Sequence, residues 1–232
     1  MKKSLLTAAL CVSSVLSMSG AVFVNDFSTG FADDGVIPDG NTSPWSDTRS
    51  LSGMTDPISS VSVHVNVSGG FNGDLYAYLS HDNVVVPLMN RVGVGTGNDL
   101  GYMDSGFDVV FSDAAANNIH FYQAVPSFNS LGASPWRPDG RTLNPVSAAS
   151  SAFDAPGAST LGSFIGVNPN GDWTLVIADV STGGQATLVG WGLSVTTLAA
   201  VPEPSEWAAL TGFALLGGAI YRRVRKNAAV AV

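Results

Sequence analysis

The central part of this 232-residue sequence has almost no basic residues. Between residues 22 and 200 there are four Arg, no Lys and no Glu against sixteen Asp, which gives this stretch a net charge of −12. Nucleic acids and anionic membrane surfaces bind to clusters of Lys and Arg, so the composition argues against both as partners. The chain has a single cysteine, Cys11, so an intrachain disulfide is excluded.

Residues that favour helices are also scarce. Only 12% of all residues are charged, whereas the chain contains 26 Gly and 12 Pro. No long amphipathic helix is indicated in the central part. Turn-forming clusters instead separate short segments in which apolar and polar residues alternate. This pattern predicts an all-β domain, as a sandwich or jelly roll.

Alternation is clearest at residues 58–67, where four valines share one face and Ser62, His64 and Asn66 share the other. Pro87 predicts that its strand lies at a sheet edge or ends there. Asn72-Gly73 is a hairpin signal. Further strands are predicted at 75–79, 84–88, 107–111, 173–178 and 187–196, the last with Val189, Trp191, Leu193 and Val195 on one face.

The first 21 residues have the parts of a secretory signal peptide. Lys2 and Lys3 form a positive start, residues 5–15 are apolar, and Ser19-Gly20-Ala21 supplies the small residues that signal peptidase reads. Cleavage is expected after Ala21. The alternative is an N-terminal anchor helix, for which the apolar run is short.

Residues 201–226 also have three parts. Pro202, Glu203 and Pro204 are followed by an apolar stretch at 207–221 and by a basic cluster of Arg222, Arg223, Arg225 and Lys226. At about 1.5 Å per residue the apolar stretch reaches only ~22 Å, less than a hydrocarbon core of about 30 Å. The basic cluster should act as a membrane stop on the cytoplasmic side, which leaves the central domain outside.

This tail resembles the PEP-CTERM sorting signal of Gram-negative bacteria, in the Pro-Glu-Pro motif, the Trp207-Ala208-Ala209-Leu210 continuation and the Arg-rich end. Glu206 departs from the pattern, because Thr is common there. The resemblance implies transient insertion into the inner membrane, recognition by an exosortase, cleavage near the motif, and delivery to the cell surface or the exopolysaccharide matrix. The chain then divides into a signal peptide (1–21), a β domain (22–200), a sorting signal (201–226) and a tail (227–232).

The β domain resembles the proprotein convertase P domain, or P/Homo B domain, over about residues 30–197. The matching segments are 73–80, 136–140, 170–179 and 190–193. The resemblance implies a galactose-binding-like jelly roll, and residues 144–158 depart from it as a loop insertion. It places five residues in family motifs: Asp74, Asp172, Trp173, Asp179 and Trp191. Asp74 and Asp172 are interpreted as structural residues that close turns.

Catalysis is not expected. P domains usually follow a subtilisin-like protease domain, and the stretch before the first clear strand is too short to hold one. The three histidines, His64, His81 and His120, lie in no motif that carries a nucleophile, and no Gly-x-Ser-x-Gly elbow occurs. They are interpreted as surface or turn residues.

Two kinds of binding residue remain. Asp99, Asp104, Asp108 and Asp113 fall in one loop-strand-loop region and are weak candidates for Ca²⁺ ligands. The interpretation favoured for them is turn capping and solubility, so no cofactor is assigned. Tyr76 and Tyr78 either project outward, where they could stack on sugars, or face a second sheet.

Three functions fit these observations. The first is an exported, non-catalytic module that interacts with an exopolysaccharide or a surface protein. The second is a carbohydrate- or calcium-binding module of the matrix. The third is an accessory P domain associated with a subtilisin-like serine endopeptidase. Signal peptidase and exosortase are the expected processing partners.

Overall fold

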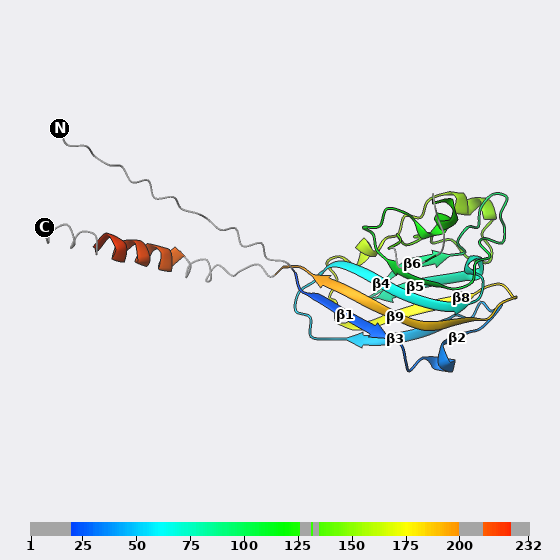
Figure 1. Ribbon diagram of the computed structural model, residues 1–232, viewed down its shortest axis with the longest axis horizontal. Coiled ribbons are helices and arrows are strands. Elements are labelled where there is room, and N and C mark those ends of the chain that lie inside the picture. Colours follow the sequence, from blue (N-terminus) through cyan, green and yellow to red (C-terminus); the bar gives the residue numbers. More distant parts are fainter. Residues whose placement is uncertain (1–19, 126–130, 132–134, 200–210, 224–232) are drawn as a thin grey trace, which may run out of the picture. The chain divides into compact units, whose positions relative to one another are not determined.

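The computed structural model describes residues 20–125, 131, 135–199 and 211–223. Several sequence predictions lie outside these residues, namely the signal peptide up to residue 19, Pro202, Glu203, Pro204, Arg225 and Lys226. Residues Ser19–Leu198 form one compact unit, which we call the β domain from here on. The all-β class predicted from composition is confirmed, because the ordered elements of this unit are strands and short 3-10 helices (Figure 1).

Two antiparallel sheets form the sandwich. The first has the order β1 (Val22–Phe27), β9 (Ala186–Thr197), β4 (Ile58–Gly69) and β7 (Phe107–Phe111), with β2 (Val36–Ile37) also paired to β9. The second has the order β3 (Trp45–Leu51), β8 (Gly171–Asp179), β5 (Leu75–His81) and β6 (Val84–Asn90). With β2 set aside, this is the strand order of a jelly roll.

Short 3-10 helices occupy the connections. They are η1 (Ala32–Gly35), η2 (Asn72–Asp74), η3 (Ile119–Ala124), η4 (Ser150–Asp154) and η5 (Leu161–Phe164). Residues 144–158, expected as an inserted loop, contain η4, whose Phe153 is 1% exposed. The Phe153 carbonyl accepts a hydrogen bond from Arg141 Nε at 2.9 Å, so this stretch is tied to the sandwich.

The core lies between the two sheets. The valines of β4 point inward as predicted, and Val63 is fully buried. Trp173 of β8 and Trp191 of β9, one from each sheet, are the largest fully buried side chains. Burying large apolar side chains is the main favourable term in folding, and here the two sheets supply one continuous core.

The face predicted for Val189 is wrong. A register shift occurs between Asn66 and Val67 of β4, where Asn66 pairs with Gly190 and Val67 with Leu188. Val189 is the extra residue of this bulge and is 46% exposed, whereas Trp191 and Leu193 are buried. A bulge adds one residue to its strand, so the alternation of inward and outward side chains before the bulge does not continue in the same phase after it.

The hairpin prediction for Asn72-Gly73 is also wrong. These residues begin η2, which carries the chain from β4 in one sheet to β5 in the other. The tight hairpin instead joins β5 to β6, where Asp82 and Asn83 have φ values of 45° and 64°. Two consecutive positive φ values are typical of a type I′ turn. The edge position predicted from Pro87 is confirmed, because β6 ends its sheet.

Residues 211–223 form a helix outside the β domain. All of its side chains are exposed, including Arg222 and Arg223 of the basic cluster. Among the described residues, no helix combines the length and apolar character needed to cross a membrane.

Candidate functional site

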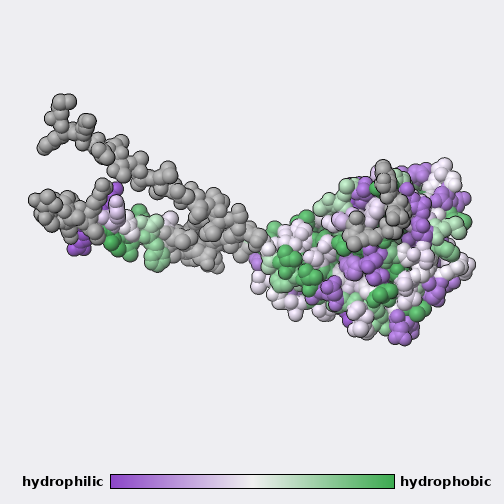
Figure 2. Space-filling view, viewed as in Figure 1, coloured by the Kyte–Doolittle hydropathy of each residue, from purple (hydrophilic) through white to green (hydrophobic). Residues whose placement is uncertain are grey.

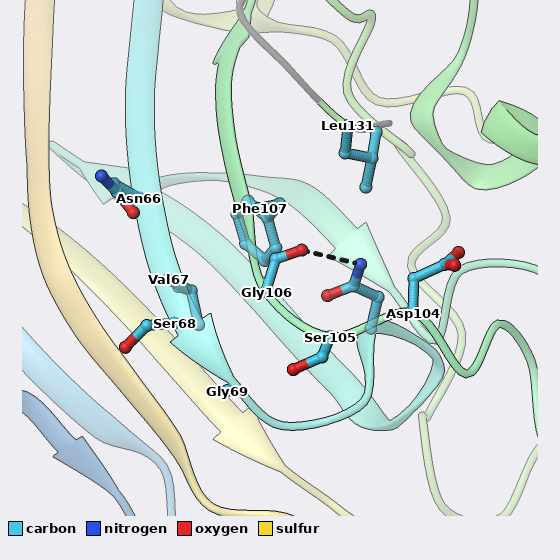
Figure 3. A pocket seen from close by; sticks show the side chains of 10 residues that line it. Asn66, Val67, Ser68, Gly69, Asp104, Ser105, Gly106, Phe107 and Leu131 are labelled. Carbon is cyan, nitrogen blue, oxygen red and sulfur yellow. Dashed lines mark hydrogen bonds between the residues drawn. The ribbon is translucent and has the colours of Figure 1, made fainter. Parts of the chain in front are cut away.

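One cavity lies at the ends of β4 and β7. We call it the Asn72 cavity; it measures about 540 Å³ and is lined by residues 66–69 and 104–107 together with Asn72 and Leu131 (Figure 3). Its size is within the range of small-molecule sites. Most of its polar groups are hydroxyl, amide and carboxylate groups, which suit a ligand held by hydrogen bonds.

A hydrogen-bonded chain forms one wall of this cavity. The Asn72 side chain, fully buried, donates through Nδ2 to the Gly106 carbonyl at 3.2 Å and to the Tyr122 hydroxyl at 3.3 Å. Tyr122 in turn donates to Asp104 Oδ2 at 2.7 Å. Burial raises the pKa of Tyr122 far above its ordinary value, so its hydroxyl stays protonated as a donor. Asn72 Oδ1 accepts no hydrogen bond from any residue that the structure describes.

His64 lies on the outer face of the first sheet. Its Nε2 is 2.5 Å from Asp108 Oδ1, and both side chains are largely solvent-accessible. A serine hydrolase needs a hydroxyl bonded to such a histidine. In the described part of the chain, no Ser or Thr hydroxyl is hydrogen-bonded to any of the three histidines.

The other two histidines are buried and were misplaced by the surface or turn interpretation. His81 is 4% exposed, and its ring nitrogens lie 2.8 and 2.7 Å from the carbonyl oxygens of Asp172 and Asn168. His120 is fully buried, with Nδ1 at 2.7 Å from Asp139 Oδ2 and Nε2 at 2.9 Å from the Val94 carbonyl. Both rings link segments that are distant in sequence.

The four aspartates considered as calcium ligands lie in different surroundings. Asp104 accepts from Tyr122, Asp108 contacts His64, and Asp113 accepts from the backbone N–H groups of Leu161 and Gly162. Asp99 is exposed. Within the described ranges, no three His, Cys, Asp or Glu side chains converge as a group that could hold a metal ion.

A different group of aspartates comes together at the β8–β9 connection. Asp179 is 1% exposed, and neither of its carboxylate oxygens has a hydrogen-bond partner of normal geometry among the described residues. Burial, then the charges of Asp39 and Asp74, raise the pKa of Asp179 to about 6, while the Ser181 N–H opposes the rise. The pKa of Asp74 is also raised, chiefly by burial. Sequence reasoning missed this group because its members come from three distant segments.

The remaining family-motif residues support the fold. Trp173 Nε1 donates to the Pro169 carbonyl at 3.0 Å, and Trp191 Nε1 donates to Asp47 Oδ2 at 2.7 Å. Asp172 accepts a hydrogen bond from Ser50, and the Asp74 carbonyl accepts from the Val180 N–H. Ala21, the predicted cleavage residue, accepts from the Thr197 N–H through its carbonyl just before β1 begins.

The orientation of Tyr76 and Tyr78, left open by the sequence, is outward. Both are half-buried on β5, alternating with the buried Leu75, Ala77 and Leu79, and their ring centroids are 5.6 Å apart. They line a cavity of about 360 Å³ with residues 42, 44 and 144–146, which we call the Tyr76 cavity.

No family model and no curated protein match the chain. A chain in the crystal structure of the Aeromonas sobria serine protease and chaperone complex is similar, with a TM-score of 0.44 and 15% identity over 78% of this chain and 27% of that chain. A structure of the protease from the same organism gives 0.43 and 14% over 76% and 27%. The chain thus spans about a quarter of the matched chains.

Proposed function

We propose that this chain is an exported, non-catalytic β-sandwich protein that is sorted to the cell surface or exopolysaccharide matrix and acts there as an interaction module. The observation that carries the proposal is the order of parts at the two ends of the chain. A signal-peptide pattern precedes the β domain, and the Pro202-Glu203-Pro204 motif, an apolar stretch and a basic cluster follow it. The net charge of −12 between residues 22 and 200 suits a protein that stays soluble outside the cell.

The arrangement of polar groups in the β domain is consistent with binding rather than turnover. Its buried histidines bond to backbone carbonyls and to Asp139, which are structural contacts. The cavities are lined by amide, hydroxyl and ring groups. Such groups recognise a ligand by hydrogen bonding and stacking.

The test is to determine both ends of the native protein by mass spectrometry in separated cell fractions. The protein should begin at Val22, end upstream of the helix at 211–223, and occur outside the inner membrane. A Pro202→Ala, Pro204→Ala double variant should keep its tail and stay with the inner membrane, whereas removal of residues 227–232 should change neither result. Native protein that is intact through Val232 and remains in the inner membrane would overturn the proposal.

A carbohydrate-binding role is a second candidate function, and the Tyr76 cavity favours it. The two tyrosine rings are outward, and no hydrogen bond to either hydroxyl is found among the described residues. Half-buried rings that face outward, with hydroxyl groups that have no partner among the described residues, can stack on a pyranose and bond to its hydroxyls. Binding of a neutral oligosaccharide that Tyr76→Ala abolishes would support this role, and binding unchanged by that variant would exclude the cavity.

A further inference from the structure

Two of the four arginines of the β domain line one cavity. This Arg137 cavity measures about 340 Å³, and its walls include Arg137, Arg141, Phe121, Ser159 and Thr160. In a stretch with sixteen Asp and only four Arg, two Arg beside one cavity are unusual. Arg141 is paired with Asp139, so Arg137 is the arginine at this cavity whose charge has no acidic partner among the described residues.

The other two arginines are bonded within the fold. Arg49 forms an ion pair with Asp47 at 2.7 Å and lies over the Phe27 ring. Arg91 donates to three backbone carbonyls, those of Gly73, Pro145 and Asp99. Both arginines therefore hold loops together.

Arg137 differs from them. Its side chain is exposed, and it forms no hydrogen bond or ion pair with any described residue. Its backbone is nevertheless fixed, because its N–H donates to the Asn117 carbonyl at 2.8 Å and its carbonyl accepts from the Ile119 N–H at 3.0 Å. A guanidinium whose donors are free can form two parallel hydrogen bonds to a planar anion such as a carboxylate.

Arg141 is the second arginine at the cavity, and its charge is paired with a carboxylate within the protein. It is 3% exposed, bonds to Asp139 through Nη1 at 2.8 Å, and has a buried Nη2 with no acceptor among the described residues. Asp139 also contacts His120 Nδ1 at 2.7 Å, which fixes this carboxylate in place. Asp113 also lines the cavity, but its two oxygens accept from the N–H groups of Leu161 and Gly162.

The rest of the wall suits a sugar ring. Phe121 is 42% exposed, with Arg141 over its ring at 5.1 Å from the centroid and the His120 ring at 4.8 Å in a T-shaped contact, so part of the ring is accessible to a ligand. Ser159 and Thr160 place hydroxyl groups at the same cavity, and no hydrogen bond of either hydroxyl is found in the described residues. An aromatic surface, hydroxyl groups and a free guanidinium match the apolar face, the hydroxyls and the carboxylate of a uronic acid.

We propose that the Arg137 cavity binds a single uronate residue of an otherwise neutral extracellular glycan. The carboxylate pairs with Arg137, the sugar ring lies against Phe121, and the sugar hydroxyls bond to Ser159 and Thr160. The net charge of −12 opposes a polyanion, so the acidic sugar is isolated among neutral ones. The claim that the ligand comes from an extracellular glycan rests on the proposed matrix location. The claim that the cavity binds a carboxylate and a sugar ring rests on the residues that line it.

The experiment is a titration of the purified chain with methyl β-glucuronide, followed by NMR, with methyl β-glucoside as the neutral isostere. The glucuronide should shift signals of residues around Arg137, and the glucoside should bind at least about tenfold more weakly, as expected when a charge-assisted bond is lost. Arg137→Gln should lose the glucuronide by a similar factor, while Arg137→Lys should bind at an intermediate level. Arg49→Gln, which removes the same charge elsewhere, should bind like the wild type if its melting curve shows a folded protein.

Three outcomes would overturn the proposal: no binding of the glucuronide, equal binding of glucuronide and glucoside, or binding unchanged by Arg137→Gln. Capture of a peptide carboxylate in place of the glucuronide would also overturn it, in favour of a protein ligand. The binding site and the matrix location can fail separately. If the native protein is found in the inner membrane but the purified chain still binds the glucuronide, the matrix location is wrong and the binding site stands.

Discussion

The imidazole of His81 lies flat on the indole of Trp173, with ring centroids 4.0 Å apart and planes within 1° of parallel. The same imidazole is within hydrogen-bond distance of two carbonyls, those of Asn168 and Asp172, in the segment that leads into β8. A carbonyl oxygen only accepts, so the ring acts toward these carbonyls as a donor. His81 therefore fixes the entry to β8 through stacking and hydrogen bonding to this segment.

Replacing His81 should separate these two contributions. His81→Ala removes both the stack and the hydrogen bonding of the ring to the Asn168 and Asp172 carbonyls, so we expect a loss of about 3 kcal/mol in the free energy of unfolding. His81→Phe keeps an aromatic ring and should lose about 2 kcal/mol. Urea denaturation measures both, with Ser80→Ala on the outward face as control. Equal stability of the Phe variant and the wild type would show that the hydrogen bonding of the ring contributes nothing.

Asp179 predicts a pH dependence of stability. Its pKa is about 6 in the folded protein against an ordinary value of 3.8, because burial and then the charges of Asp39 and Asp74 disfavour ionisation. Folding therefore favours the protonated carboxyl. The stabilising contribution is complete below about pH 4 and is lost as the pH rises through about 6, with a size of up to about 3 kcal/mol.

Asp179→Asn removes this charge while keeping the shape. The variant should be more stable than the wild type above pH 6 and should differ little from it near pH 4. Asp99→Asn, at an exposed position, is the matched control and should leave the stability curve unchanged. Thermal unfolding measured across this range tests the sign, and a variant that is less stable than the wild type at pH 7 would contradict it.

The strands of the centre were predictable because their alternation is local. The pattern at 58–67 becomes β4 and that at 107–111 matches β7. β3 was not predicted, because its sequence, Trp45–Leu51, contains Asp47 and Arg49, which looks like a loop. Asp47 is 9% exposed and accepts hydrogen bonds from both Arg49 and the Trp191 indole, so its partners come from two strands that the sequence could not bring together.

The candidate sites were less predictable than the strands. Asp104 was considered for its charge, but its structural role depends on Tyr122 and Gln123, which belong to η3. Arg137 appeared only as part of a family-like motif, although the scarcity of cations in the β domain was already visible. Arg137 stands out because it lacks an acidic partner among the described residues, and this becomes visible only from the tertiary contacts.

We expect the exposed His64–Asp108 pair to contribute little to stability and to take no part in catalysis. Exposed ion pairs contribute little to stability, so His64→Ala should change the free energy of unfolding by less than about 0.5 kcal/mol. The purified chain should also fail to cleave an unstructured protein substrate. Turnover that disappears in His64→Ala but persists in Ser80→Ala would contradict the non-catalytic interpretation.

Removal of residues 202–232 should leave a folded and soluble β domain. The core residues that pack together lie between Ile37 and Val195, and the last strand ends at Thr197. The helix at 211–223 has only exposed side chains, so its loss removes no described core contact. The truncated chain should unfold cooperatively, with a midpoint within a few degrees of the full chain, since a loss of about 1 kcal/mol shifts the midpoint by only about 2–4 °C at this size.

A second truncation supplies the control. Removing residues 186–232 deletes β9, which pairs with both β1 and β4 and contributes Trp191 to the core. That chain should not fold, and its circular dichroism should lack the cooperative transition. If the shorter truncation at 202 also fails to unfold cooperatively, the boundary of the β domain lies beyond Leu198 and the tail is part of the fold. In that case the tail could not be a removable sorting segment.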